Sequence, residues 1–70
     1  MAAPVIVHAP APAGGRAVTT RSGDRLGVAY GPQDLLEFLR RAGLAEDDFA
    51  LDDRSLIEWR GAGPDVWEAA

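Results

Sequence analysis

The sequence predicts a small single domain of the α+β class, in which one amphipathic helix packs on a sheet of short strands. Short runs of β-branched and apolar residues, separated by turn residues, occur in both halves of the chain. One apolar stripe at helical spacing lies between them. The length of 70 residues allows one domain over 1–70 and little more.

The first strand is expected at Val5, Ile6, Val7 and His8. Pro4 and Pro10 flank this run, and proline cannot donate a hydrogen bond to a neighbouring strand. We therefore expect an edge strand. Residues 9–15 (APAPAGG) have no hydrophobic periodicity and form a Pro/Gly-rich connector within the domain.

A β-hairpin is expected next, with strands at 16–20 and 25–30. The turn residues 22–24 include Gly23, which can adopt a positive φ. In the second strand, large residues alternate with Arg25, Gly27 and Ala29, so this strand has one bulky face and one thin face. The thin face either meets solvent or lets another part of the backbone come close.

The helix is expected over about 32–42. Its apolar stripe, at i, i+3, i+4 and i+7, consists of Leu35, Phe38, Leu39 and Ala42. Pro32 suits the first helical position, and Gly43 suits the left-handed position just after the last turn. The sequence therefore marks both ends of this helix.

An acidic loop is expected at 46–53 (EDDFALDD), with a short helical turn around 52–56 as an open alternative for its end. Its carboxylates are Glu46, Asp47, Asp48, Asp52 and Asp53. Calcium prefers such oxygen ligands, but the alternating spacing and central glycine of an EF-hand loop are missing. We expect a solvated loop and no metal site.

A second β-hairpin is expected at the end of the chain, with strands at 57–60 and 65–68 around the turn sequence GAGP. Its register stays open. A four-residue loop pairs Trp59 with Val66, whereas a five-residue loop places Trp59 opposite Trp67. The four-residue loop exposes one tryptophan to solvent.

Residues for catalysis are scarce in this chain. It has no cysteine, His8 is the single histidine, and Ser22 and Ser55 lack the flanking residues of a nucleophile elbow. No phosphate-binding glycine loop with its lysine is present. We therefore predict no enzyme activity, no catalytic residue and no cofactor, and we interpret His8 as an ordinary strand residue.

The charge distribution gives one functional hypothesis. Residues 1–35 hold three Arg against two Asp, whereas residues 36–70 hold four Arg against nine acids. Arg16, Arg21 and Arg25 gather on the first hairpin, and arginines on a β-ribbon can contact phosphates. A nucleic-acid-binding accessory protein is therefore the alternative function, although the net charge of −4 disfavours it.

The leading hypothesis is a non-catalytic interaction or regulatory module that binds an unidentified protein partner. Tryptophan and arginine are frequent at the energetic centres of interfaces. The expected contact residues are Trp59, Arg60 and Trp67, with Asp52 and Asp53 beside them. A homodimer is an open alternative because the core is small. We expect no signal peptide and no membrane segment, and hence a cytoplasmic protein.

Three stretches, VIVHAPAPAGGRAV, DLLEFLRRAGL and LIEWRGAGPDVWEA, resemble those of a family of small uncharacterised proteins from Streptomyces and related actinobacteria. The resemblance covers nearly the whole chain. It implies one compact domain in a bacterial cytoplasm, and it brings no activity, cofactor or partner with it.

Overall fold

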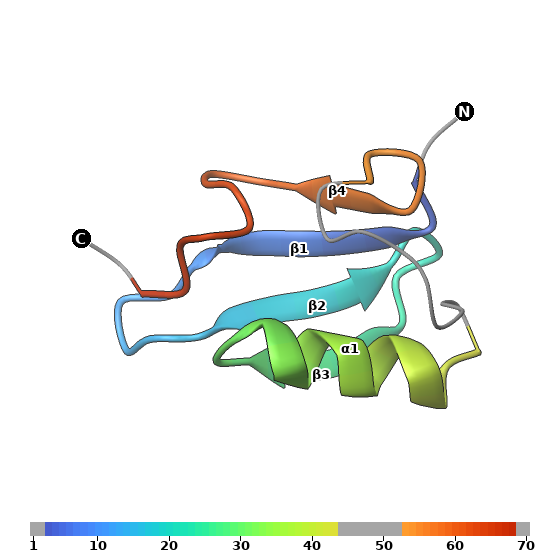
Figure 1. The fold of residues 1–70 in the computed structure, drawn as a ribbon, viewed down its shortest axis with the longest axis horizontal. Coiled ribbons are helices and arrows are strands. Elements are labelled where there is room, and N and C mark those ends of the chain that lie inside the picture. Colours follow the sequence, from blue (N-terminus) through green and yellow to red (C-terminus); the bar gives the residue numbers. More distant parts are fainter. Residues whose placement is uncertain (1–2, 44–52, 69–70) are drawn as a thin grey trace.

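The computed structural model describes residues 3–43 and 53–68, and the strands in this part form one four-stranded sheet (Figure 1). The elements are β1 (Val5–Pro10), β2 (Arg16–Thr20), β3 (Arg25–Ala29), α1 (Pro32–Arg41) and β4 (Ile57–Trp59). The sheet order is β3-β2-β1-β4; β4 runs parallel to β1, and the other neighbours are antiparallel. The predicted α+β fold, with a helix packed against a small sheet, is confirmed.

The hairpin of β2 and β3 forms as predicted. The backbone N–H of Thr20 donates to the carbonyl of Asp24 at 2.8 Å, which closes the turn. Gly23 has a φ of +102°, a conformation that glycine adopts without strain. The local turn signal in the sequence therefore gave the correct position of this hairpin.

The expectation that the first strand lies at an edge is wrong, because β1 lies between β2 and β4. The two prolines do not prevent this. Pro4 precedes the strand, and Pro10 is its last residue, beyond a register shift that follows Val7. The middle of β1 therefore keeps the backbone donors that a central strand needs on both sides.

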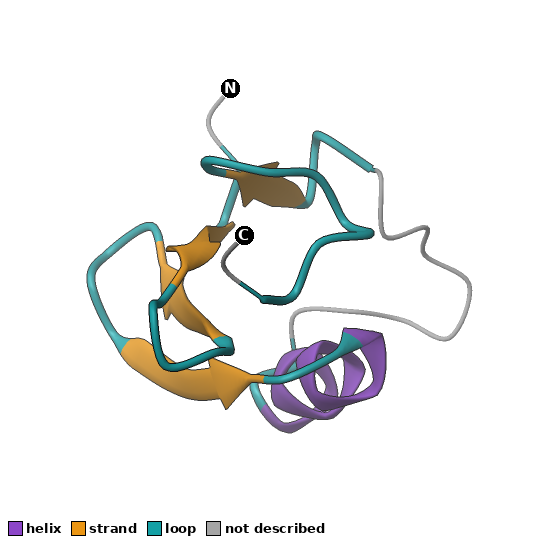
Figure 2. Ribbon diagram, turned by 90° about the vertical axis from the view of Figure 1, so that its left-hand side faces the viewer, coloured by secondary structure: helices purple, strands orange, loops and turns teal. Residues whose placement is uncertain are grey.

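The core forms on one face of the sheet. Alternation along the strands places Val7 on this face together with its cross-strand neighbours Val18 and Trp59. The buried cluster consists of Val5, Val7, Val18, Ala29, Leu35, Leu39 and Ile57. Figure 2 shows that the sheet curves, and that α1 and the chain after β4 both lie on its concave side.

The thin face of β3 meets the helix. A Cβ built on Gly27 would lie only 2.7 Å from Cζ of Phe38, so the phenylalanine ring sits directly on the glycine. Ala29, on the same face, is fully buried. Small residues in β3 therefore let α1 approach the sheet closely, which resolves the alternative that the sequence left open.

The helix agrees with its prediction to within one residue. It begins at Pro32 and ends at Arg41, with Ala42 as its C-cap. Gly43 follows with a φ of +68°, and its N–H donates to the carbonyl of Arg40 at 3.1 Å. The glycine stop signal therefore worked as expected.

The predicted C-terminal hairpin is wrong. After β4, residues 60–68, which we call the C-terminal segment, contain no strand. β4 pairs with β1 instead, through bonds such as that from the Arg60 N–H to the Val7 carbonyl at 2.9 Å. Before β4, the N–H of Leu56 donates to the Asp53 carbonyl at 3.1 Å, which forms the short turn suggested by the sequence. The rest of the predicted acidic loop lies outside the described residues.

We predict that Gly27→Ala destabilises the fold by about 2–4 kcal/mol, because the methyl group collides with Phe38 and the φ of +149° strains any side chain. Gly23→Ala has the strain of a positive φ but open space around the new Cβ, so we expect a loss of stability of about 1 kcal/mol. Gly63→Ala causes neither backbone strain nor a collision and should change stability by less than about 0.5 kcal/mol. Urea denaturation measures all three, and equal losses would contradict the close approach of the helix.

Candidate functional site

Arg16 is fully buried, and the C-terminal segment folds around its side chain. A guanidinium group has five N–H donors. All five engage backbone carbonyls at 2.7–2.9 Å, belonging to His8, Arg60, Ala62, Gly63 and Val66. Four of these carbonyls belong to residues 60–66, which contain no strand, so Arg16 supplies hydrogen bonds there that a second hairpin would have supplied.

Both predicted contact tryptophans pack around this guanidinium. Its central carbon lies 5.0 Å from the ring centroid of Trp59 and 5.9 Å from that of Trp67. The two rings meet edge to face at 86°, with centroids 5.7 Å apart. Burial lowers the pKa of Arg16 from its ordinary value, and the carbonyl dipoles and aromatic faces compensate for the lost hydration. Both half-buried tryptophans therefore support the fold.

The contact surface expected from the sequence does not come together as one patch. Trp59 faces the core side of β4, whereas Arg60 turns to the opposite side, where its Nε donates to Glu58. This separation follows from the alternation of side chains along a strand. Asp53 lies in the turn before β4, and Asp52 lies outside the described residues. The tryptophans and Arg60 therefore belong to two different surfaces.

A cluster of three charged side chains lies on the convex, outer face of the sheet. Arg21 Nη2 donates to Glu58 Oε1 at 2.6 Å, and Arg60 Nε donates to Glu58 Oε2 at 2.5 Å. Hydrogen bonds from Arg21 and then Arg60 lower the pKa of Glu58 below its ordinary value. Residues 37 positions apart in the chain thus form one ionic network, which the sequence did not reveal.

His8 lies on the same outer face. Its Nε2 and the Thr19 hydroxyl are 2.8 Å apart, in keeping with the expected role of a hydrogen-bonded strand residue. A histidine beside a hydroxyl resembles two members of a catalytic triad, but catalysis also needs a group that orients the histidine and a stabilised oxyanion site. No carboxylate hydrogen-bonds His8 among the described residues.

The three arginines proposed for nucleic-acid binding have different environments. Arg16 is buried, which corrects the expectation that its guanidinium lies on the surface of the first hairpin. Arg21 is held by Glu58 and also donates through Nε to the Ala3 carbonyl at 3.0 Å. Arg25 is exposed. Only Arg21 and Arg25 of this set can therefore reach a ligand in solution.

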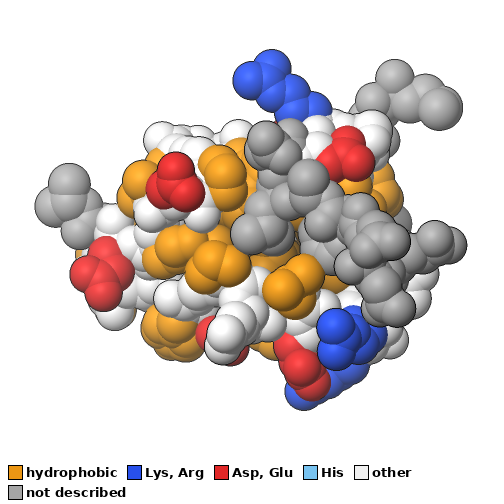
Figure 3. Space-filling model, in the orientation of Figure 1, with side chains coloured by type: hydrophobic (Ala, Val, Ile, Leu, Met, Phe, Trp, Pro, Cys, Tyr) orange, Lys and Arg blue, Asp and Glu red, His pale blue; other side chains and the backbone are white. Residues whose placement is uncertain are grey.

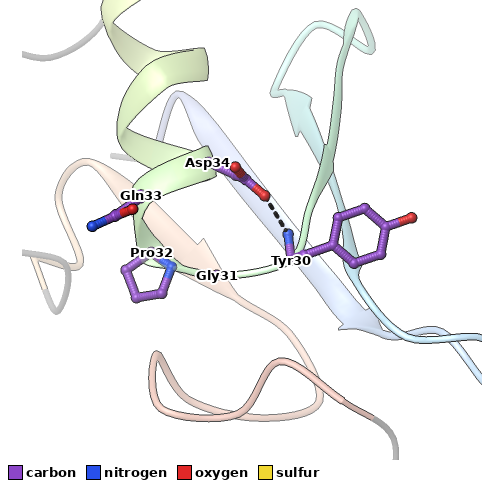
Figure 4. Close-up of a pocket in the computed structure, with 5 residues that line it drawn as sticks. All are labelled: Tyr30, Gly31, Pro32, Gln33 and Asp34. Carbon is purple, nitrogen blue, oxygen red and sulfur yellow. Dashed lines mark hydrogen bonds between the residues drawn. The ribbon is translucent and has the colours of Figure 1, made fainter.

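An open hollow of about 500 Å³ lies at the start of α1 and is lined by residues 30–34 (Figure 4). The Asp34 carboxylate accepts a hydrogen bond from the backbone N–H of Tyr30 at 2.9 Å. Figure 4 shows the Tyr30 ring directed away from Pro32, so the two side chains do not enclose a ligand. We interpret the Asp34 contact as a structural link between β3 and the helix.

Groups of metal-binding side chains are absent from the described ranges: no three His, Cys, Asp or Glu residues come together there. Asp53 is held by Ser55, whose hydroxyl and N–H both donate to its carboxylate, and these bonds lower the pKa of Asp53. The other four acids of the predicted loop lie outside the described residues. In the same ranges, no helix has the length and apolar character to cross a membrane.

The role of Arg16 was missed at the sequence level, although one signal for it existed. Arg16 precedes Val18 by two positions in a predicted strand, so both side chains point to the same face. An arginine on the core face needs a partner for every donor. The glycine-rich turn and the tryptophans downstream provide that partner, but the sequence does not show that they lie nearby.

Searches for related proteins gave no significant match to a family model, a curated protein or a solved structure.

We predict that Arg16→Met destabilises the fold by about 3–5 kcal/mol, because five carbonyls lose their donors in a buried site. A chain of this length has a stability of roughly 4–10 kcal/mol, so the variant should be largely unfolded at 37 °C. Urea denaturation followed by tryptophan fluorescence measures the loss. Arg54→Met, at an exposed arginine, is the matched control and should behave as the wild type.

A chemical rescue separates the hydrogen bonds from mere loss of volume. In Arg16→Gly, about 10 mM guanidinium should raise the unfolding midpoint relative to sodium at equal ionic strength, because an ion bound only by the folded state stabilises it. A midpoint that is the same in both salts, together with wild-type stability of Arg16→Met, would contradict the assigned role.

We also predict that Glu58 contributes to stability at neutral pH and loses this contribution in acid. Its pKa is lowered in the folded state, so the contribution is complete above its ordinary value of 4.5 and disappears as the pH falls through the lowered value. Denaturation midpoints measured from about pH 6 to pH 3 should therefore fall less steeply in Glu58→Gln. Asp65→Asn, at an exposed carboxylate, is the control, and a Glu58→Gln profile parallel to the wild type would contradict the network.

Proposed function

We propose that this chain is a non-catalytic interaction module that binds a protein partner in the cytoplasm through the surface formed by its C-terminal segment and α1. Figure 3 shows hydrophobic side chains gathered on this face of the molecule. Val66 is 42% exposed, and the half-buried Trp67 follows it directly. Apolar side chains that remain together at a surface favour protein binding.

Arg16 supports this proposal because it fixes the conformation of the exposed segment. Four of its five carbonyl partners belong to residues 60–66. Trp67 is held further by a 2.9 Å hydrogen bond from its Nε1 to the Pro64 carbonyl. A segment that is already ordered loses little entropy when it binds. The exposed Val66 beside this fixed Trp67 is the observation on which the proposal rests.

The charge around Val66 favours one kind of partner. A small hollow here is lined by residues 65–68, and two of the four, Asp65 and Glu68, carry exposed carboxylates. Opposite charges at the rim of an interface speed association and exclude wrong partners. We therefore propose a partner segment with an apolar side chain for Val66 and basic side chains beside it.

Val66→Asp tests the proposal, because it places a charge in the apolar surface while its backbone carbonyl can still bind Arg16. The immobilised wild-type chain should recover a partner from lysate of its source organism, and Val66→Asp should recover at least about tenfold less. Arg54→Asp is the control, since Arg54 is exposed and lies in the turn before β4, outside both the C-terminal segment and α1.

Equal recovery by wild type and Val66→Asp, with both proteins folded by circular dichroism, would contradict the proposed surface. Light scattering of the purified chain covers the alternative of a homodimer: a dimer that Val66→Asp converts to a monomer would identify the partner as a second copy. Trp67→Ala is unsuitable here, because the ring also supports Arg16.

A further inference from the structure

The outer face of the sheet has a set of charged residues that the proposed partner surface does not use. Strand pairing places one residue of each strand in a single row across this face. Thr19 of β2 is the partner of both Arg25 of β3 and Ile6 of β1, and Ile6 is the partner of Glu58 of β4. A register shift between Val18 and Thr19 in the pairing of β2 with β3 places Arg25 on this face, although Gly27 faces the helix. The row therefore has an arginine at one edge and a glutamate at the other.

Two further arginines reach this row at the Glu58 end. Since β2 and β4 lie on opposite sides of β1, the Arg21 side chain must extend over β1 to reach Glu58. Its hydrogen bond to the Ala3 carbonyl fixes that course. Arg60 directly follows β4, and its Nε donates to the other carboxylate oxygen of Glu58. Glu58 therefore holds two guanidinium groups on either side of one carboxylate.

Both guanidinium groups keep donors for a ligand. Arg21 uses Nε and Nη2, and Arg60 uses Nε, so Nη1 of Arg21 and both terminal nitrogens of Arg60 have no hydrogen-bond partner within residues 3–43 and 53–68. The side chains are 38% and 49% exposed. The two arginines stand against one glutamate, so the cluster of Arg21, Glu58 and Arg60 carries a formal charge of +1.

We infer that Arg21 and Arg60 form a binding site for a phosphate group on the outer face of the sheet. The planar guanidinium fork matches the oxygens of a phosphate, and two forks held near one another can share them. A phosphate group carries −1.5 to −2 charges at neutral pH, and the net positive charge of the cluster attracts it. The group belongs to a small phosphate ester or to the backbone of a nucleic acid.

A titration of the isotope-labelled chain with inorganic phosphate, followed by amide NMR at constant ionic strength, tests this site. The amide signals of Arg21, Glu58 and Arg60 should shift and saturate at millimolar phosphate. Arg21→Gln and Arg60→Gln should each weaken binding by about fivefold, as expected for one exposed charge contact. Arg54 is exposed and makes none of the hydrogen bonds of the cluster, so Arg54→Gln should bind as the wild type does.

Shifts that stay linear and are reproduced by chloride, or equal affinities of Arg60→Gln and wild type, would overturn the site. A parallel titration with a single-stranded DNA oligonucleotide distinguishes the two sources. Much tighter, salt-sensitive binding that Arg60→Gln weakens assigns the site to nucleic acid, whereas tighter binding of inorganic phosphate assigns it to a small ester. Thermal unfolding of each variant confirms that the fold is retained.

Discussion

The contact between one guanidinium and five backbone carbonyls determines the path of the last part of the chain. The C-terminal segment has no strand partner, and it is short of large apolar residues that face the core. Without Arg16, the carbonyls of Arg60, Ala62 and Val66 would lose this donor, and the Gly63 carbonyl would keep only the 3.3 Å bond from the Val66 N–H. Arg16 belongs to β2, binds the His8 carbonyl of β1 and lies against Trp59 and Trp67. Its side chain therefore connects the C-terminal segment to both strands. The concave side of the sheet is therefore closed partly by a polar interaction in a fold whose apolar core is small.

Arginine suits this position for geometric reasons. Its five donors spread in one plane, so they can serve carbonyls that approach from several directions, while the two faces of the plane stay free for aromatic rings. Lysine offers three donors on a flexible stem, and an apolar residue offers none. Gly61, with a φ of +81°, lets the chain turn sharply enough after β4 for the following carbonyls to point at a single group. The positions of Gly61, Trp59 and Trp67 are therefore explained by the shape of this side chain.

The parts of the fold that could be predicted from the sequence are those with local signals. Helix α1 has its periodic stripe and its Gly43 stop within one segment, and the β2-β3 turn is marked by Gly23. The partner of β4 could not be predicted, because its pairing with β1 joins residues about fifty positions apart. The same holds for Arg21 and Glu58, which are separated by 37 positions. The hairpin predicted for the last residues followed from local turn and strand signals, but Arg16 binds four carbonyls of that region and the Gly15 N–H binds the Trp67 carbonyl instead of a neighbouring strand.

Strand β4 connects the two surfaces that could bind ligands. Its three residues alternate, so Ile57 and Trp59 point to the core while Glu58 points to the outer face, and Arg60 follows Glu58 outward. The Arg60 side chain belongs to the outer cluster, yet its backbone carbonyl is bound by Arg16 on the concave side. A displacement of the C-terminal segment would therefore move Arg60 relative to Glu58 as well. The surface proposed for a protein partner and the charged cluster of the opposite face therefore meet at one residue, which contributes its backbone to the first and its side chain to the second.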